Sequence, residues 1–212
     1  TRIYSDEPVI DCTWDSFVFE SAGIATLAFS SGSNSNTFDY LRVVNIGVST
    51  AVDSAAADAL CSAASIGLNF GPGTKIKSGY FEGVPIGIYA VWDDITYENI
   101  ELYNCGWSTS LTTNDSMVFI SAVDNASIRG IRYKIDNTGL TWNSTIIRAN
   151  GTGRGTTLRD VTDFNTSIFT LGRISTPVTH TDWRMDNVRI QSGTTSHNAT
   201  GKVSFCTGLS DT

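Results

Sequence analysis

The sequence is poor in the residues from which several kinds of functional site are built. Only two of its 212 residues are histidine, His180 and His197, and neither has cysteine or carboxylate neighbours at the spacing of metal ligands. No GxSxG element is present, so a serine nucleophile on a strand-to-helix turn is not indicated. The sequence therefore predicts no metal site and no cofactor.

Basic charge and long apolar runs are also scarce. The chain has 14 Lys and Arg against 21 Asp and Glu, with a net charge of −7 and a pI of about 4.7. A nucleic-acid-binding surface needs a basic face, so we expect no nucleic-acid partner. No apolar run approaches the roughly 18 residues that span a bilayer, and we expect no membrane insertion. Because the chain starts at Thr1 without Met or a signal peptide, we expect it to be a piece of a longer or processed polypeptide.

Cysteine and proline occur only four times each. The cysteines are far apart and form no CxxC pair, which argues against zinc and leaves open two disulfides or four buried thiols. Few prolines combined with abundant Asn, Ser, Thr and Gly are typical of many short strands joined by polar turns.

One stretch, residues 53–79, divides the chain. It reads DSAAADALCSAAS, then GLNFGPGTKIKSG after one isoleucine, which predicts a small-residue helix at residues 53–64, a strand, a Gly-Pro-Gly turn and a second strand. We interpret residues 1–50 as an N-terminal cap or the edge of a preceding domain. For residues 51–212 we expect a parallel β-helix.

A six-residue pattern recurs after this stretch. It consists of an apolar residue, any residue, then Asn, Gly or Asp, then Ile or Val, any residue and usually an apolar residue. The third positions are 31, 30 and 27 residues apart, and they are Asn99, Gly130, Asp160 and Asn187. Gly79, 20 residues before Asn99, is a candidate earlier member. The apolar residues before the third position and those after it alternate out of step by one residue. A bend at the third position is therefore needed to point both sets toward one face. Asn, Gly and Asp are the residues that tolerate the left-handed backbone of such a bend.

A third apolar run follows each motif, giving three short strands per repeat of about 20 to 30 residues. This arrangement predicts an all-β fold, a right-handed single-stranded parallel β-helix with a short capping α-helix near residues 53–64. A β-sandwich is the alternative, but it does not explain a phase shift that recurs at one motif position.

The segments DSAAADALCSAAS and GLNFGPGTKIKSG together resemble the opening cap and first coil of the pectate-lyase-like parallel β-helix superfamily, in its bacteriophage tailspike or tail-fibre form. The resemblance covers roughly residues 53–205. It implies a virion tail or extracellular location, a homotrimer, contacts with other virion tail proteins, and a host surface polysaccharide as ligand. The enzyme members of this superfamily carry a set of motifs that this chain has only in part. Asp93-Asp94 corresponds to one of them, but no GHG element occurs. The resemblance therefore assigns no catalytic residue.

Outward positions beside each predicted bend form ladders of charged residues in successive repeats. The position before the bend holds Glu98, Arg129, Arg159 and Asp186, and the position two beyond it holds Glu101, Arg132, Thr162 and Arg189. These side chains could grip sugar hydroxyls and carboxylates, or they could form ion pairs between repeats on a solvated face. Trp107 and Trp142, in connections between strands, are candidates for stacking on sugar rings. The candidate glycan-binding residues are Trp107, Trp142, Arg129, Arg132 and Arg159.

Glycoside hydrolysis needs two carboxyl groups about 5 to 9.5 Å apart. Candidate pairs are Asp93 with Asp94 or Glu98, and Asp160 with Asp163. A purely structural reading is available for Asp160, which occupies the bend position. The leading hypothesis is binding of host surface polysaccharide for attachment. The alternatives are a polysaccharide hydrolase or lyase on the same scaffold and a structural spacer.

Overall fold

The computed structural model describes the chain in separate segments, which are residues 2–4, 7–21, 26–28, 32–45, 51, 71–84, 88–90, 92–105, 118–121, 123–136, 145–150, 152–163, 173–175, 180–189 and 200–204. Within these segments the fold is all-β, and none of them contains a helix. The helix predicted near residues 53–64 lies outside the described residues.

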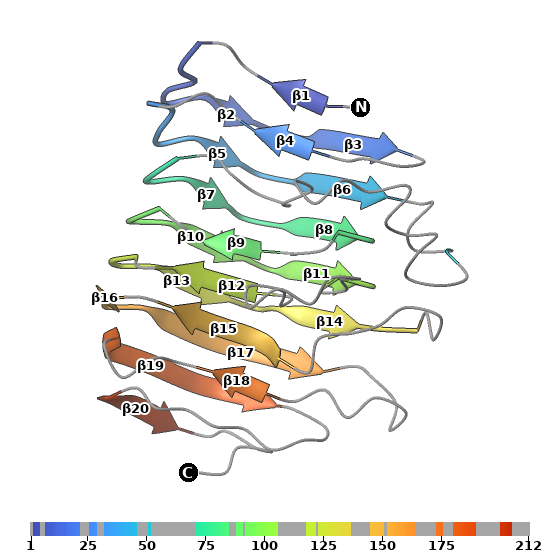
Figure 1. Ribbon diagram of the computed structural model, residues 1–212. Coiled ribbons are helices and arrows are strands. Elements are labelled where there is room, and N and C mark those ends of the chain that lie inside the picture. Colours follow the sequence, from blue (N-terminus) through green and yellow to red (C-terminus); the bar gives the residue numbers. More distant parts are fainter. Residues whose placement is uncertain are drawn as a thin grey trace.

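The largest sheet has 14 strands, arranged as two parallel ladders that share two long strands (Figure 1). The first ladder contains β2 (Thr13–Trp14), β5 (Thr37–Phe38), β7 (Lys75–Ile76), β10 (Thr96–Glu98) and β13 (Ser127–Arg129). The second contains β3 (Phe17–Ser21), β6 (Leu41–Asn45), β8 (Gly79–Glu82), β11 (Ile100–Tyr103) and β14 (Arg132–Lys134).

The shared strands are β17 (Thr157–Asp163) and β19 (His180–Arg189). Strand β17 pairs with β13 at its start and with β14 at its end, and β19 continues both ladders beside it. Strand β19 also pairs with β16 (Gly153–Arg154) and β20 (Thr200–Ser204). The two ladders are therefore two halves of each repeat, separated by a bend in the earlier layers.

Two smaller sheets lie beside the large one. One contains β9 (Ile88–Ala90), β12 (Val118–Ser121), β15 (Thr145–Asn150) and β18 (Arg173–Ser175), and the other contains β1 (Arg2–Tyr4) and β4 (Thr26–Ala28). All pairs among the described strands are parallel. In Figure 1 the layers follow one another from the N-terminal to the C-terminal end. The predicted all-β, parallel architecture is confirmed.

The predicted bend at the third motif position is also confirmed. Asn99, Gly130, Asp160 and Asn187 all have positive φ angles, of 52°, 68°, 54° and 52°. Gly79 does not share this position, because it pairs with Ile100 and the residue beside Asn99 is therefore Ser78. Assigning Gly79 to the motif was thus wrong by one residue.

A second column of left-handed residues precedes the first ladder, and the sequence reading missed it. It comprises Asp11, Ser35, Gly73, Asp94, Asn125, Gly155 and Asp182, all with positive φ. The backbone amides of the first five donate to the carbonyl of the preceding position in the next layer, as Asp94 does to Asp124 at 3.0 Å. Each layer is therefore turned by one bend before the first ladder, and most layers have another bend before the second ladder.

The core consists of columns in which one inward side chain per layer contacts the next. In the first ladder Phe38, Ile76, Tyr97, Ile128, Leu158 and Met185 are in register and almost wholly buried. Trp14 stacks on Phe38 with ring centroids 6.1 Å apart and packs against the edge of Phe17. Strands from residues 1–50 thus share one sheet with those that follow, while the division of the chain at residue 50 stays a prediction.

Candidate functional site: a polar groove along the bend

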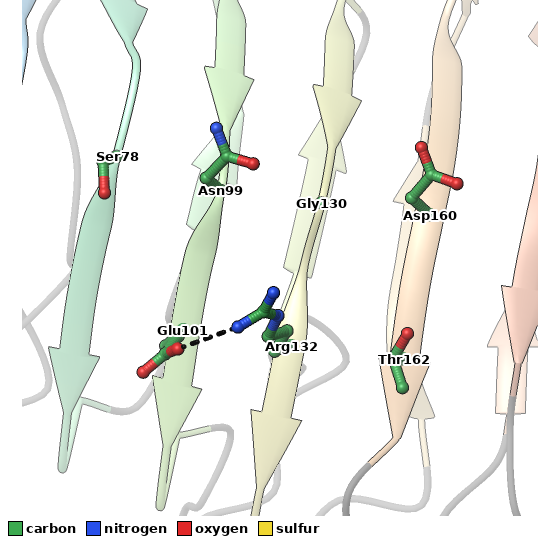
Figure 2. A pocket seen from close by; sticks show the side chains of 7 residues that line it. All are labelled: Ser78, Asn99, Glu101, Gly130, Arg132, Asp160 and Thr162. Carbon is green, nitrogen blue, oxygen red and sulfur yellow. Dashed lines mark hydrogen bonds and ion pairs between the residues drawn. The ribbon is translucent and has the colours of Figure 1, made fainter.

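A groove of about 530 Å³ runs along the bend between the two ladders (Figure 2). Its lining comes from the bend position in four successive layers and from the position two residues beyond it in three. The residues are Ser78, Asn99, Gly130 and Asp160 at the bend, and Glu101, Arg132 and Thr162 beside it. Since parallel neighbours are about 4.8 Å apart, the four bend residues span about 14 Å.

The floor of the groove is hollow at Gly130, where there is no side chain (Figure 2). A Cβ atom at this position would lie 2.9 Å from Oδ1 of Asn99. The Asn99 amide is held by donating from Nδ2 to the Lys77 carbonyl at 3.1 Å. On the other side, Oδ1 of Asp160 accepts from Nδ2 of Asn187 at 2.6 Å. The polar groups of the floor are thus positioned by their neighbouring layers.

One wall of the groove is an exposed ion pair. Nη1 of Arg132 lies 3.4 Å from Oε1 of Glu101, and both side chains are more than half exposed, at 61% and 52%. An exposed pair of this kind contributes about 0 to 1 kcal/mol to stability. Most of the guanidinium donors of Arg132 are therefore available to a ligand in the groove.

The predicted charge ladders are in register as expected. Glu98, Arg129, Arg159 and Asp186 align one before the bend, and Glu101, Arg132, Thr162 and Arg189 align two beyond it. Arg129 contacts Glu98 at 2.9 Å and Arg159 contacts Asp186 at 3.5 Å. The hydrogen bond with Glu98 raises the pKa of Arg129 above its ordinary value. Ion pairs between layers, one of the two readings, are confirmed, and their contact with sugars stays a prediction.

Arg129 and Arg159 lie outside the groove lining, whereas Arg132 belongs to it. The three arginines that the sequence grouped together therefore have different surroundings. The other two glycan candidates, Trp107 and Trp142, lie outside the described residues.

Of the five candidate catalytic carboxylates, Asp160 lines the groove. Asp93 and Asp94 lie in the other bend column, where Asp93 Oδ1 accepts from the Asp124 amide at 2.8 Å and Asp94 Oδ1 accepts from the Asn125 side chain at 3.0 Å. Glu98 is paired with Arg129. The backbone of Asp163 ends β17 opposite Tyr133. Asp93, Asp94 and Glu98 thus each hold a neighbouring layer.

Sequence reasoning missed Ser78, Asn99, Glu101, Gly130 and Thr162 as residues of one site. The signal for them was present, because each stands at the bend position or two residues beyond it. What the pattern lacked was a sign that these two columns, and not the ion-pair column before the bend, border a hollow.

Two of the four cysteines lie in the described segments. Cys105 is free and buried, and burial raises the pKa of its thiol to about 12. Cys12 is free and half-buried, whereas Cys61 and Cys206 lie outside the described residues. Across the segments described above, no three His, Cys, Asp or Glu side chains gather as a metal site would require. The same segments contain no helix long and apolar enough to cross a membrane.

The chain was compared with models of known protein families, with curated proteins and with solved structures. None of the three comparisons finds a match. The site must therefore be interpreted from its own geometry and chemistry.

Proposed function

We propose that this chain is a β-helical receptor-binding segment of bacteriophage tailspike or tail-fibre type, which binds a host surface polysaccharide along the polar groove. The observation that carries this proposal is the groove itself, in which carboxylate, guanidinium, amide and hydroxyl groups line four successive layers. A glycan chain presents hydroxyl groups along its whole length. An open track of fixed donors and acceptors is complementary to such a ligand.

We also propose that the strands wind as a right-handed parallel β-helix. Supporting this winding, β17 and β19 each run through both ladders, so the ladders are consecutive parts of one coil. Successive bends on the second ladder are 31, 30 and 27 residues apart in the sequence yet lie in neighbouring layers. In keeping with the proposed class, the assembly is a homotrimer on the virion tail, beside other tail proteins.

Binding to an array of bacterial capsular polysaccharides and lipopolysaccharides tests the function. Arg132→Gln removes the groove guanidinium, and Arg159→Gln is its matched control because Arg159 is similarly exposed and paired but lies outside the lining. A lost charge-assisted hydrogen bond costs about 1.5 to 3 kcal/mol, so Arg132→Gln should weaken binding by about 10- to 100-fold. Arg159→Gln should leave it unchanged. Equal weakening by both variants would instead assign binding to the ion-pair column.

A depolymerase is the second candidate, because Glu101 and Asp160 both line the groove with Arg132 beside them. Any polysaccharide that binds should therefore be incubated with the protein and assayed for new reducing ends and for absorbance of unsaturated uronate. Product formation, lost in Glu101→Gln, would replace the binding proposal by an enzyme. Binding without turnover supports the receptor function. Absence of binding to every glycan would favour a structural spacer.

A further inference from the structure

A notch interrupts the floor of the groove at Gly130, in the layer between Asn99 and Asp160 (Figure 2). These three residues occupy the bend position of successive layers. Since neighbouring layers are about 4.8 Å apart, Asn99 and Asp160 stand on layers about 10 Å apart, with no side chain between them. We call this gap the Gly130 notch.

The side of the notch toward Asn99 presents a hydrogen-bond acceptor. Nδ2 of Asn99 donates to the Lys77 carbonyl at 3.1 Å, on the side away from Gly130. The amide oxygen therefore faces the notch, and a Cβ atom on Gly130 would lie 2.9 Å from it. This is hydrogen-bond distance, so a donor group of a ligand at that point would bond to Oδ1 of Asn99.

The opposite side of the notch presents a second acceptor. Oδ1 of Asp160 accepts from Nδ2 of Asn187 at 2.6 Å, in the layer beyond. Figure 2 shows the other carboxylate oxygen of Asp160, Oδ2, on the side toward Gly130. An amide oxygen and a carboxylate oxygen thus face each other across the notch. A ligand group between them must donate in both directions.

The charges beside the notch balance overall but not locally. In the layers from Asn99 to Asn187, the positions at the bend, one before it and two beyond it hold four carboxylates and four arginines, which are Glu98, Glu101, Asp160, Asp186, Arg129, Arg132, Arg159 and Arg189. Three of the arginines contact the carboxylates other than Asp160, with nitrogen-to-oxygen distances of 2.9, 3.4 and 3.5 Å. Nε of Arg189 donates instead to Oδ1 of Asn187, and Asp160 affects the pKa of Arg129 less than Glu98 does. Among the described residues, Asp160 is therefore the one carboxylate of this set without an ion pair, and the notch keeps a local negative charge.

The same series of residues recurs in the other bend column. Nδ2 of Asn125 donates to Oδ1 of Asp94 at 3.0 Å, and a Cβ atom on Gly155 would lie 2.9 Å from Oδ1 of Asn125. Asp182 occupies the bend position of the next layer. This second Asn–Gly–Asp series lies outside the groove lining. It therefore provides an internal control, with the same residue types but no groove to hold the rest of a ligand.

A protonated amine is the ligand group that fits two facing acceptors and a local negative charge. A hydroxyl has one donor hydrogen and can donate to only one of the two oxygens, whereas an ammonium group has three. Its hydrogen bond to a carboxylate is charge-assisted and roughly twice as strong as one between neutral groups. An N-acetylated amine has a single N–H donor and no charge, so it would lose both advantages.

We propose that the Gly130 notch binds the protonated amino group of an amino sugar, which donates to Oδ1 of Asn99 and to Oδ2 of Asp160. This inference rests on the proposed function, because the sugar is one unit of the glycan that lies along the groove. It goes further in assigning that glycan to the class with unacetylated amino sugars. It also makes Gly130 a specificity-determining residue, since the missing side chain admits the amine.

The test is a magnetic resonance titration of the intact ¹⁵N-labelled chain with methyl glucosaminide at about pH 6, where the amine is protonated. We expect the side-chain amide signal of Asn99, assigned by its loss in Asn99→Asp, to shift. Methyl glucosaminide should bind about tenfold more tightly than methyl N-acetylglucosaminide or methyl glucoside. Asp160→Asn should remove this preference and still form the bend, since Asn187 has a positive φ at the same motif position. Asp182→Asn, in the second series, is the matched control and should retain the preference.

Gly130→Asn closes the notch without changing its charge. The new amide can donate to Oδ1 of Asn99 as Asn187 donates to Asp160, so we expect this variant to fold. Urea denaturation checks that it does. The folded variant should bind methyl glucosaminide no more tightly than methyl glucoside.

Equal affinity for the amino and N-acetylated sugars, a preference that survives Asp160→Asn, or one that Asp182→Asn also removes would overturn the inference. Methylammonium binding as tightly as methyl glucosaminide would overturn it too, because the notch would then hold a bare cation. Failure of the inference is distinguishable from failure of the proposed function. Polysaccharide binding that depends on Arg132 but survives Asp160→Asn and Gly130→Asn would refute the notch and leave the function standing. Glucosaminide binding at the notch without binding of any host polysaccharide would refute the function instead.

Discussion

Gly130 provides the sharpest test of the bend between the two ladders. Its φ is +68°, and a Cβ atom there would lie 2.9 Å from Oδ1 of Asn99. The left-handed conformation costs an alanine about 1 to 2 kcal/mol. Displacing the Asn99 amide also endangers its 3.1 Å hydrogen bond to the Lys77 carbonyl, worth about 1 kcal/mol. We therefore expect Gly130→Ala to lower the free energy of unfolding by about 2 to 3 kcal/mol.

Gly130→Asn separates backbone strain from steric crowding. Asn adopts the left-handed region more readily than Ala, and Asn187 already does so at the same motif position. The amide of Asn187 also donates to Asp160 in the neighbouring layer, a contact that Gly130→Asn can imitate with Asn99. This variant should lose less than half as much stability as Gly130→Ala.

Urea denaturation followed by circular dichroism measures both variants. For a chain of this size, about 2 to 3 kcal/mol corresponds to roughly 4 to 12 °C in thermal midpoint. A Gly130→Ala protein as stable as the parent would show that the bend does not require a left-handed residue. Equal losses for the two variants would show that crowding, and not backbone conformation, makes glycine necessary at this position.

Three further predictions concern the core and the titrating groups. Tyr97→Ala should lower the free energy of unfolding by about 3 to 5 kcal/mol, because the fully buried ring contacts the column on both sides. Denaturant unfolding measures this loss, and a loss below about 1 kcal/mol would contradict the column packing. Iodoacetamide at pH 8 should modify the half-buried Cys12 in the folded protein. Cys105, whose thiol is buried with a pKa of about 12, should react only after denaturant is added. Peptide mass mapping identifies which cysteine is alkylated in each case. Burial and a hydrogen bond that its hydroxyl donates to Asp136 raise the pKa of Tyr103 to about 12. Ultraviolet titration should show Tyr103 ionising near this pKa, and Asp136→Asn should lower it. Since the folded pKa exceeds that of the unfolded chain, the stabilisation from this group is complete below about pH 10 and lost as the pH rises toward 12; unchanged ionisation in the variant would contradict the hydrogen bond.

The amino-acid sequence was sufficient to predict the parallel all-β fold and one column of bends. Alternating apolar residues change phase at Asn99, Gly130, Asp160 and Asn187, and only a left-handed residue reconciles the two phases. The same motif also predicted which charged residues meet across layers, such as Glu98 with Arg129. This success has a local cause, since six residues around each bend contain both the turn signal and the register.

The second column of bends was missed because its residues vary more. Asp94, Asn125 and Gly155 each precede a small or apolar buried residue and then an outward Thr or Ser, a pattern too short to stand out. Asp93 and Asp94 were consequently read as catalytic candidates. In the structure their carboxylates accept hydrogen bonds from the next layer.

What only the tertiary structure decided is which outward columns border a hollow. Arg132 and Arg159 occur in similar motifs, yet the first lines the groove and the second lies outside it. Tyr80 and Tyr103 are 23 residues apart in the sequence, yet they line one hollow because β8 and β11 pair in register. The physical reason is that side chains in neighbouring layers are separated by connections of variable length. Sequence spacing indicates that a residue points outward, but the pairing of whole layers determines what it points toward.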